Sequence, residues 1–143
     1  MHTIIKLLES EMQSIELSFA KKPILIDGMA MEYYGIRKSG SDIDFVVSDE
    51  DYQAFASMMP DKRKDIYGDL GIVIGAFEIW RSIALLDYNF YLKDAVEESN
   101  VFVISLDRLL LTRVNAMEAE THIPSYQKNH GIVFDGQYKD KNI

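Results

Sequence analysis

The sequence predicts an α/β fold of the α+β kind, in which a mixed β-sheet of about four to five strands packs against helices. Three observations predict it. An amphipathic helical pattern opens the chain, short apolar runs of strand length recur along it, and helical patterns separate those runs. Because some runs are wholly apolar and others alternate with polar residues, we expect both buried and half-exposed strands.

The first half of the chain contains three predicted helices and two predicted strands. Residues 3–20 predict a helix because apolar residues recur at spacings of three and four, and residues 23–26 (PILI) predict a buried strand. A second helix is predicted to start over residues 30–34 and a strand over 42–47. Ser48 is expected to cap a third helix that ends before Pro60.

The second half predicts two alternating strands within residues 71–83, a helix over 83–99, a strand over 101–104 and a strongly apolar helix over 106–117. In the 83–99 helix the expected buried positions include Leu86, Phe90 and Ala95, and two tyrosines are expected to pack rather than to stack on a base. Residues 122–143 lose this periodicity and predict a loose or partner-dependent tail. We expect residues 1–143 to form a single domain.

Composition excludes several classes of protein. A chain of 143 residues that is 48% hydrophobic and 27% charged is typical of one globular core. No apolar run reaches membrane-spanning length, and acids near the N-terminus interrupt any signal peptide, so a cytoplasmic location is expected. The absence of cysteine excludes disulfides and cysteine-ligated zinc. The three histidines, His2, His122 and His130, lack the spacing of a metal pair.

The net charge of −8 argues against a broad nucleic-acid surface, because duplex binding requires many Lys and Arg residues to neutralise phosphates. The basic residues instead form three short clusters, at 21–22, 37–38 and 62–64. The middle cluster precedes an acidic pair closely enough to meet a phosphate, although it also fits a solvated loop. A small substrate or one protein partner with a basic face fits this charge better than DNA.

The acidic pair Asp42 and Asp44, in the sequence DIDFVV, is the most informative feature. Residues two apart on a strand face the same side, so both carboxylates are predicted to project together while Ile43 and Phe45 enter the core. Adjacent carboxylates repel, and a cation that both ligate relieves the repulsion. With the glycine turn predicted at residues 26–28, the pair predicts a magnesium-binding phosphoryl-transfer site, although the alternation also fits a strand whose polar face meets water.

These residues resemble the nucleotidyltransferases of the DNA polymerase beta type. Their signature is an apolar residue, Gly, then Gly or Ser, a spacer of about ten residues, and an alternating acidic pair. The matching residues are Ile26-Asp27-Gly28-Met29, a spacer over residues 30–41, and Asp42-Ile43-Asp44-Phe45. Residues 34–39 also resemble the segment before the acidic strand of small bacterial members, and residues 101–107 resemble their later strand-to-helix junction. Arg113 stands in the following helix, where members often have Lys.

The resemblance implies a nucleotidyltransferase-type fold and in-line attack of an acceptor hydroxyl on the α-phosphate of a nucleoside triphosphate. It implies that Asp42 and Asp44 hold two Mg²⁺ ions about 4 Å apart. It also implies a set of nucleotide-binding residues, which are Gly28, Met29, Arg37, Lys38 and Ser39. Met29 departs from the pattern, since the family usually has Gly or Ser there. A methionine side chain at this position would crowd a triphosphate, while its backbone N–H would stay available.

A complete member of this family needs a third carboxylate on a later strand, as a metal ligand or general base. Glu78 is the predicted residue because it lies between Phe77 and Ile79 in an alternating strand and therefore on the polar face. Asp69 and Arg81 are weaker alternatives. A solvated strand residue without function is an equally open interpretation of Glu78.

The acceptor stays open between a protein, a tRNA and a small molecule. Because no acceptor-binding domain is expected after about residue 117, the chain resembles a toxin-antitoxin type or a resistance-type nucleotidyltransferase. Two alternatives stand beside this enzyme. One is a catalytically degenerate nucleotidyltransferase fold that serves as a binding or regulatory module through a protein partner, and the other is a plain metal-binding structural domain.

Overall fold

The computed structural model describes residues 3–112 of the chain. The chain divides into two units, residues 1–105 and 106–143. In the second unit the described residues, 106–112, are helical, as predicted for the start of the helix over 106–117. Arg113, the three histidines and the predicted tail lie outside the described residues. The expectation of a single domain therefore stays a prediction.

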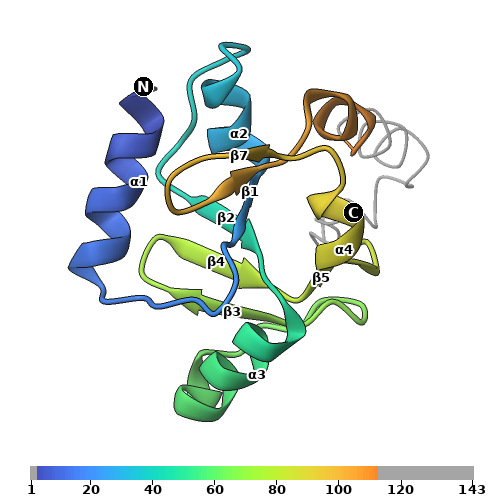
Figure 1. Ribbon diagram of the computed structural model, residues 1–143. Helices are drawn as coiled ribbons and strands as arrows, with labels where there is room; N and C mark the ends of the chain where they lie inside the picture. The colour runs from blue at the N-terminus through green and yellow to red at the C-terminus, as the bar shows by residue number, and fades with distance from the viewer. Residues whose placement is uncertain (1–2, 113–143) are drawn as a thin grey trace, which may run out of the picture. The chain divides into compact units, whose positions relative to one another are not determined.

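The first unit consists of a six-stranded sheet with helices on both sides and a small separate hairpin (Figure 1). Its elements in chain order are α1 (Thr3–Ser14), β1 (Ile24–Ile26), α2 (Asp27–Tyr33), β2 (Ile43–Val46), α3 (Asp49–Met58), the 3-10 turn η1 (Pro60–Lys62), β3 (Gly71–Ile74), β4 (Phe77–Trp80), β5 (Ser82–Ile83), β6 (Leu86–Asp87), α4 (Tyr88–Leu92), β7 (Val96–Glu97) and β8 (Phe102–Val103).

The main sheet has the order β3-β4-β2-β1-β8-β7, and β5 pairs with β6 in the separate hairpin. It is mixed, because β2 pairs parallel with β4 and β1 parallel with β8 while the other pairs are antiparallel. The predicted α/β fold with a mixed sheet is confirmed. The observed sheet exceeds the expected size because β7 forms within a segment that was predicted to be helical.

The central strand β1 is buried along its whole length, as its apolar sequence predicts. α1 and α4 lie on opposite sides of the sheet (Figure 1). α1 buries the stripe Ile4, Ile5, Leu8 and Met12. α4 buries Tyr88 and Tyr91, which confirms that these tyrosines pack.

The prediction that the first helix extends to residue 20 is wrong, because α1 ends at Ser14. Glu16 adopts a left-handed conformation, with φ of 57°. The N–H groups of Glu16 and Leu17 donate to the carbonyls of Gln13 and Met12, which is the Schellman arrangement that closes a helix C-terminus. Glycine is the usual residue in this position. Because glutamate stands here instead, the end of the helix could not be predicted from the sequence.

Phe19 still packs in the core after the helix has ended. Its ring contacts those of Phe45 and Phe55 edge to face, with centroids 6.0 and 5.3 Å apart. The extended segment after α1 therefore takes over the packing that the helical pattern assigned to a longer helix.

The glycine turn predicted between β1 and the second helix is also absent. α2 begins at Asp27, directly after β1, so Gly28 and Met29 lie in its first turn. The residue with a left-handed backbone is Asp27, whose φ is 57°. The change of direction therefore takes place one residue before the glycine.

The third helix, α3, agrees with its prediction. The Ser48 hydroxyl accepts from the Asp51 N–H at 3.2 Å, and the helix ends before Pro60. The buried Asp51 carboxylate also accepts from the N–H groups of Ala20 and Lys21, at 2.8 and 3.1 Å. Asp51 thus ties the entry to β1 to the start of α3.

The helix predicted over residues 83–99 is wrong, and the segment contains β5, β6, α4 and β7 instead. The Asp69 carboxylate accepts from the N–H groups of Ala84 and Leu85, both at 2.8 Å, and from the Ser82 hydroxyl at 2.7 Å. These bonds hold the tight turn between β5 and β6. Leu86, predicted to be buried, is 38% exposed.

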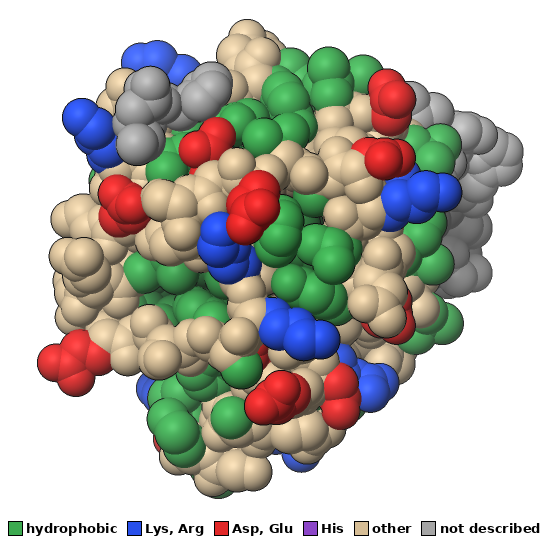
Figure 2. Space-filling view, viewed as in Figure 1, with side chains coloured by type: hydrophobic (Ala, Val, Ile, Leu, Met, Phe, Trp, Pro, Cys, Tyr) green, Lys and Arg blue, Asp and Glu red, His purple; other side chains and the backbone are tan. Residues whose placement is uncertain are grey.

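Two expectations from composition concern the surface. Within residues 3–112, no helix combines the length and the apolar character that a membrane crossing requires. On the face shown in Figure 2, Lys and Arg side chains are scattered among Asp and Glu side chains rather than gathered into one basic area.

Gly71 permits the close approach of β3 to β4. A Cβ added there would lie 2.5 Å from the ring of Trp80 and 3.0 Å from the Lys64 carbonyl oxygen. Trp80 lies on β4, the strand that carries Glu78, and Lys64 lies in the segment before β3.

We expect Gly71→Ala to lower the free energy of unfolding by about 1–3 kcal/mol, because the buried Trp80 ring must move. Gly40→Ala is the matched control, since a Cβ at Gly40 meets nothing within 4 Å. Urea denaturation of both variants measures the difference. Equal stability of the two would contradict the packing described for Trp80.

Candidate active site

The alternation predicted for the acidic strand is confirmed. Ile43 and Phe45 are buried, at 1% and 0% exposure, while Asp44 faces the other side of the sheet and is half-buried. Asp42 is exposed and lies just before β2 begins. Of the predicted pair, Asp44 is therefore the residue enclosed by the sheet.

Glu78 lies directly beside Asp44. β2 and β4 are parallel neighbours, and their register pairs Asp44 with Glu78. Neighbouring strands are about 4.8 Å apart, and paired residues face the same side. The sheet therefore brings together two carboxylates that are separated in the sequence by α3, η1 and β3.

The two alternatives to Glu78 lie elsewhere. The Asp69 carboxylate is occupied by the turn between β5 and β6. Arg81 follows the end of β4 and lies 3.4 Å from an Asp49 carboxylate oxygen. Glu78 therefore has the geometry of the third acid, while its role stays a prediction.

Asp27 is a further carboxylate of this site, and it was missed at the level of sequence. β1 pairs antiparallel with β2 so that Ile26 lies opposite Asp44, and Asp27 follows at the end of the strand. The negative charge of Asp27 raises the pKa of Asp44. The sequence does contain an indication of this role, because Asp27 directly follows a wholly apolar strand. From the sequence alone, Asp27 instead belongs to the predicted glycine turn at residues 26–28.

The electrostatics of the site disfavour the charge on Asp44. Burial is the largest cause that raises the pKa of Asp44 well above its usual value, and the carboxylates of Asp27, Glu78 and Asp42 raise it further. The Lys64 ammonium acts in the opposite direction. Within the described part of the chain, the Asp44 carboxylate has no hydrogen-bond donor and no salt bridge.

The donor set suits a hard cation, which prefers carboxylate oxygens. Among residues 3–112, however, no three Asp, Glu, His or Cys side chains converge into a closed metal site. Mg²⁺ commonly takes one or two carboxylates and completes its shell with water and substrate phosphates. The Asp44 and Glu78 pair fits that open type of site.

Two residues of the predicted phosphate-binding segment lie side by side. Gly28 lies beside Ser39, because a Cβ on Gly28 would be 3.7 Å from the Ser39 Cβ. The Ser39 hydroxyl and N–H both donate to Glu32, at 2.7 and 2.9 Å. These bonds lower the pKa of Glu32 and fix the loop that leads into β2.

The Met29 side chain is buried, whereas the basic pair Arg37 and Lys38 is exposed. The Met29 side chain is 5% exposed, so it is part of the core and does not crowd the space above the helix. The Arg37 Nε lies 3.1 Å from the Met31 sulfur. Lys38 is exposed and contributes to lowering the pKa of Glu32.

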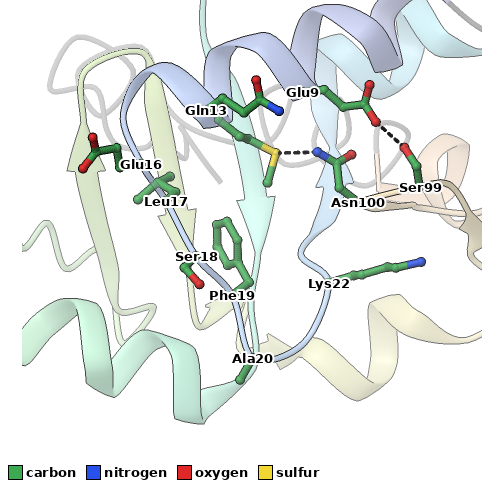
Figure 3. Close-up of a pocket in the computed structure, with 11 residues that line it drawn as sticks. Glu9, Gln13, Glu16, Leu17, Ser18, Phe19, Ala20, Lys22, Ser99 and Asn100 are labelled. Atoms are coloured by element: carbon green, nitrogen blue, oxygen red, sulfur yellow. Dashed lines mark hydrogen bonds between the residues drawn. The ribbon is translucent and has the colours of Figure 1, made fainter.

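A separate cleft of about 610 Å³ lies between the end of α1, the segment after it and the loop before β8 (Figure 3). Its lining includes Glu9, Gln13, Lys22, Ser99 and Asn100. The Ser99 hydroxyl donates to Glu9 at 2.5 Å, and the Asn100 amide contacts the Met12 sulfur at 3.5 Å. None of the predicted site residues lines this cleft, so it is distinct from the carboxylate pair.

No protein family and no curated protein matched the sequence. Among solved structures, the fold is similar to a crystal structure from Thermotoga maritima described as "a putative nucleotidyltransferase". The TM-score is 0.53 at 12% sequence identity, and the match covers 82% of this chain and 86% of the other. The chain therefore has a nucleotidyltransferase-like fold.

We expect Asp44→Asn to stabilise the cation-free protein at neutral pH. A raised pKa means that the folded state binds the proton more tightly than the unfolded chain, so stability falls as the pH rises from the usual value of 3.8 toward the raised value. The gain is about 1.4 kcal/mol for each unit by which the pKa is raised. The gain decreases as the pH falls from the raised value toward 3.8, and it is absent below 3.8.

Thermal denaturation with a chelator across this pH range measures the effect. Asp61→Asn, at an exposed position in η1, is the control and should change stability by less than about 0.5 kcal/mol. A less stable Asp44→Asn protein at neutral pH would show that the charge of Asp44 has a stabilising partner.

Proposed function

We propose that this protein is a magnesium-dependent nucleotidyltransferase, which transfers a nucleoside monophosphate from a nucleoside triphosphate to a hydroxyl of an acceptor, with pyrophosphate as the leaving group. The nucleotidyltransferase-like fold supports this proposal. The observation that carries it is the Asp44 carboxylate, which lies beside Glu78 and Asp27 without a hydrogen-bond donor among the described residues. The neighbouring carboxylates repel one another, and a bound cation relieves this repulsion.

On this proposal Asp44 and Glu78 hold Mg²⁺ from neighbouring strands, and Asp42 joins them from the exposed start of β2. Bound there, Mg²⁺ would lower the pKa of the attacking hydroxyl and neutralise charge on the phosphates. Because the protein supplies few ligands, phosphate oxygens of the nucleotide complete the shell. A bound nucleotide would therefore strengthen the binding of the cation, and the cation would strengthen the binding of the nucleotide.

The chain's own residues have three tasks. Asp44 and Glu78 orient the cation, and Glu78 accepts the proton of the acceptor hydroxyl or completes the metal shell. Main-chain N–H groups at Gly28 and Met29 face the phosphates, close to Ser39. Arg37 and Lys38 supply positive charge if the loop that carries them closes over a bound triphosphate.

The second candidate is a degenerate module of the same fold, which binds a protein partner without catalysis. The lack of three converging metal ligands in residues 3–112 favours it. The acceptor of an active enzyme, whether protein, tRNA or small molecule, is not defined by the residues that form this site.

Calorimetric titration with ATP, GTP, CTP and UTP, each with and without Mg²⁺, separates the two candidates. We expect Mg²⁺-dependent binding of at least one nucleotide, and its loss in Asp44→Asn because the cation loses a ligand. Asp61→Asn should bind as the unmodified protein does. Binding of none of the four nucleotides, or binding that is indifferent to Mg²⁺ and to Asp44→Asn, would favour the degenerate module.

Position 29 gives a further prediction. Because the Met29 side chain is buried, Met29→Ser should not widen a phosphate pocket but should destabilise the core, by about 2–5 kcal/mol as for other deletions of buried side chains. Urea denaturation and the same nucleotide titrations measure the two effects. Tighter nucleotide binding without a loss of stability would instead show that methionine crowds the ligand.

A further inference from the structure

Lys64 reaches the candidate site from the edge of the sheet. Its N–H donates to the Gly71 carbonyl at 2.8 Å, so its backbone runs beside β3. The Nζ lies 3.5 Å from a Glu78 carboxylate oxygen. Since Glu78 pairs with Val73 on one side and with Asp44 on the other, Lys64 faces the carboxylates from the β3 side.

Lys64 brings a positive charge to a group of acidic side chains. Glu78 is paired with Asp44 in the register of β4 and β2, and the Lys64 ammonium lies against this pair, 3.5 Å from a Glu78 carboxylate oxygen. The Lys64 side chain is 44% exposed, whereas Glu78 is 26% exposed. The ammonium therefore lies against the partly enclosed acids on a flexible stem that has open space beside it.

We propose that Lys64 is the internal counter-ion of the Asp44 and Glu78 carboxylates and that a divalent cation displaces it on binding. The inference rests on the cation site of the proposed function. Two cations close together repel each other, so Lys64 has to move away as the metal enters. Its long side chain allows this movement without a change in the backbone.

Lys64 would then have two opposite effects. In the cation-free protein it reduces the repulsion among the acids and stabilises the fold. During metal binding it competes for the same carboxylates and weakens the observed affinity. A lysine on the surface without a role at this site would produce neither effect. A lysine that helped to hold the metal ion or its ligands would increase the affinity for the metal ion.

Trp80 provides a built-in reporter of this site. It is the one tryptophan of the chain and lies two residues after Glu78 on β4, on the same face. Side chains at this spacing are about 7 Å apart. Terbium luminescence sensitised by Trp80 therefore reports an ion bound by Asp44 and Glu78, without any nucleotide or turnover.

The test is titration of the full chain with Tb³⁺, followed by displacement with Mn²⁺. We expect Lys64→Met to bind both ions between about twofold and tenfold more tightly than the unmodified protein. Lys64→Arg keeps the charge and should bind nearly as the unmodified protein does. Lys62→Met, an exposed lysine in η1, makes the same change in net charge and should have little effect.

Thermal denaturation supplies a second readout. We expect Lys64→Met to have a lower melting temperature than the unmodified protein in a chelator, and Mn²⁺ to close the gap. Equal or weaker ion binding by Lys64→Met, with binding intact in the unmodified protein, would overturn the role of Lys64 and leave the cation site in place.

The same titration distinguishes failure of the proposed function. If neither the unmodified protein nor Lys64→Met gave a luminescence signal that Asp44→Asn removes, with or without a nucleoside triphosphate, there would be no cation site, and both proposals would be overturned. If only Lys64→Met bound the ions, Lys64 would block the site completely in the unmodified protein, and the displacement proposal would be supported.

Discussion

The register of β2 between β1 and β4 is the constraint on which the candidate site depends. Antiparallel pairing with β1 sets Ile26 opposite Asp44, and parallel pairing with β4 sets Glu78 beside it. A slip by one residue would turn Ile43 and Phe45 toward the acidic side and Asp44 into the core. The apolar contacts of Phe45 with Phe19 and Phe77 therefore also fix the position of a carboxylate.

That register has an electrostatic cost. Packing places Asp44 near three other carboxylates, and no described donor compensates its charge directly. A structural role would be served as well by a neutral polar residue, which makes a plain structural domain a poor explanation of this site. The proposed cation site accounts for this cost with the same residues in both states, because the cation binds the carboxylates in one state and Lys64 lies against them in the other.

The sequence predicted those parts of the fold whose determinants are local. Alternation placed Asp44 and Glu78 on polar strand faces, and the side chain of Ser48 marked a helix start. The helix over 83–99 failed because Asp69, distant in sequence, takes the N–H groups of Ala84 and Leu85. Asp27 and Lys64 were not placed in the site for the same reason, since only the pairing of strands and the contact with Glu78 brings them to it.

The incomplete ligand set bears on how such a site would act. A closed cage of carboxylates would hold Mg²⁺ with or without substrate, whereas two acids on neighbouring strands leave positions for phosphate oxygens. Coupling of this kind is reciprocal, so a nucleotide that completes the shell raises the affinity for the ion as much as the ion raises the affinity for the nucleotide. The counter-ion Lys64 lowers the affinity for the ion with or without nucleotide, so occupancy of the site at a given ion concentration depends more on the affinity that the nucleotide adds.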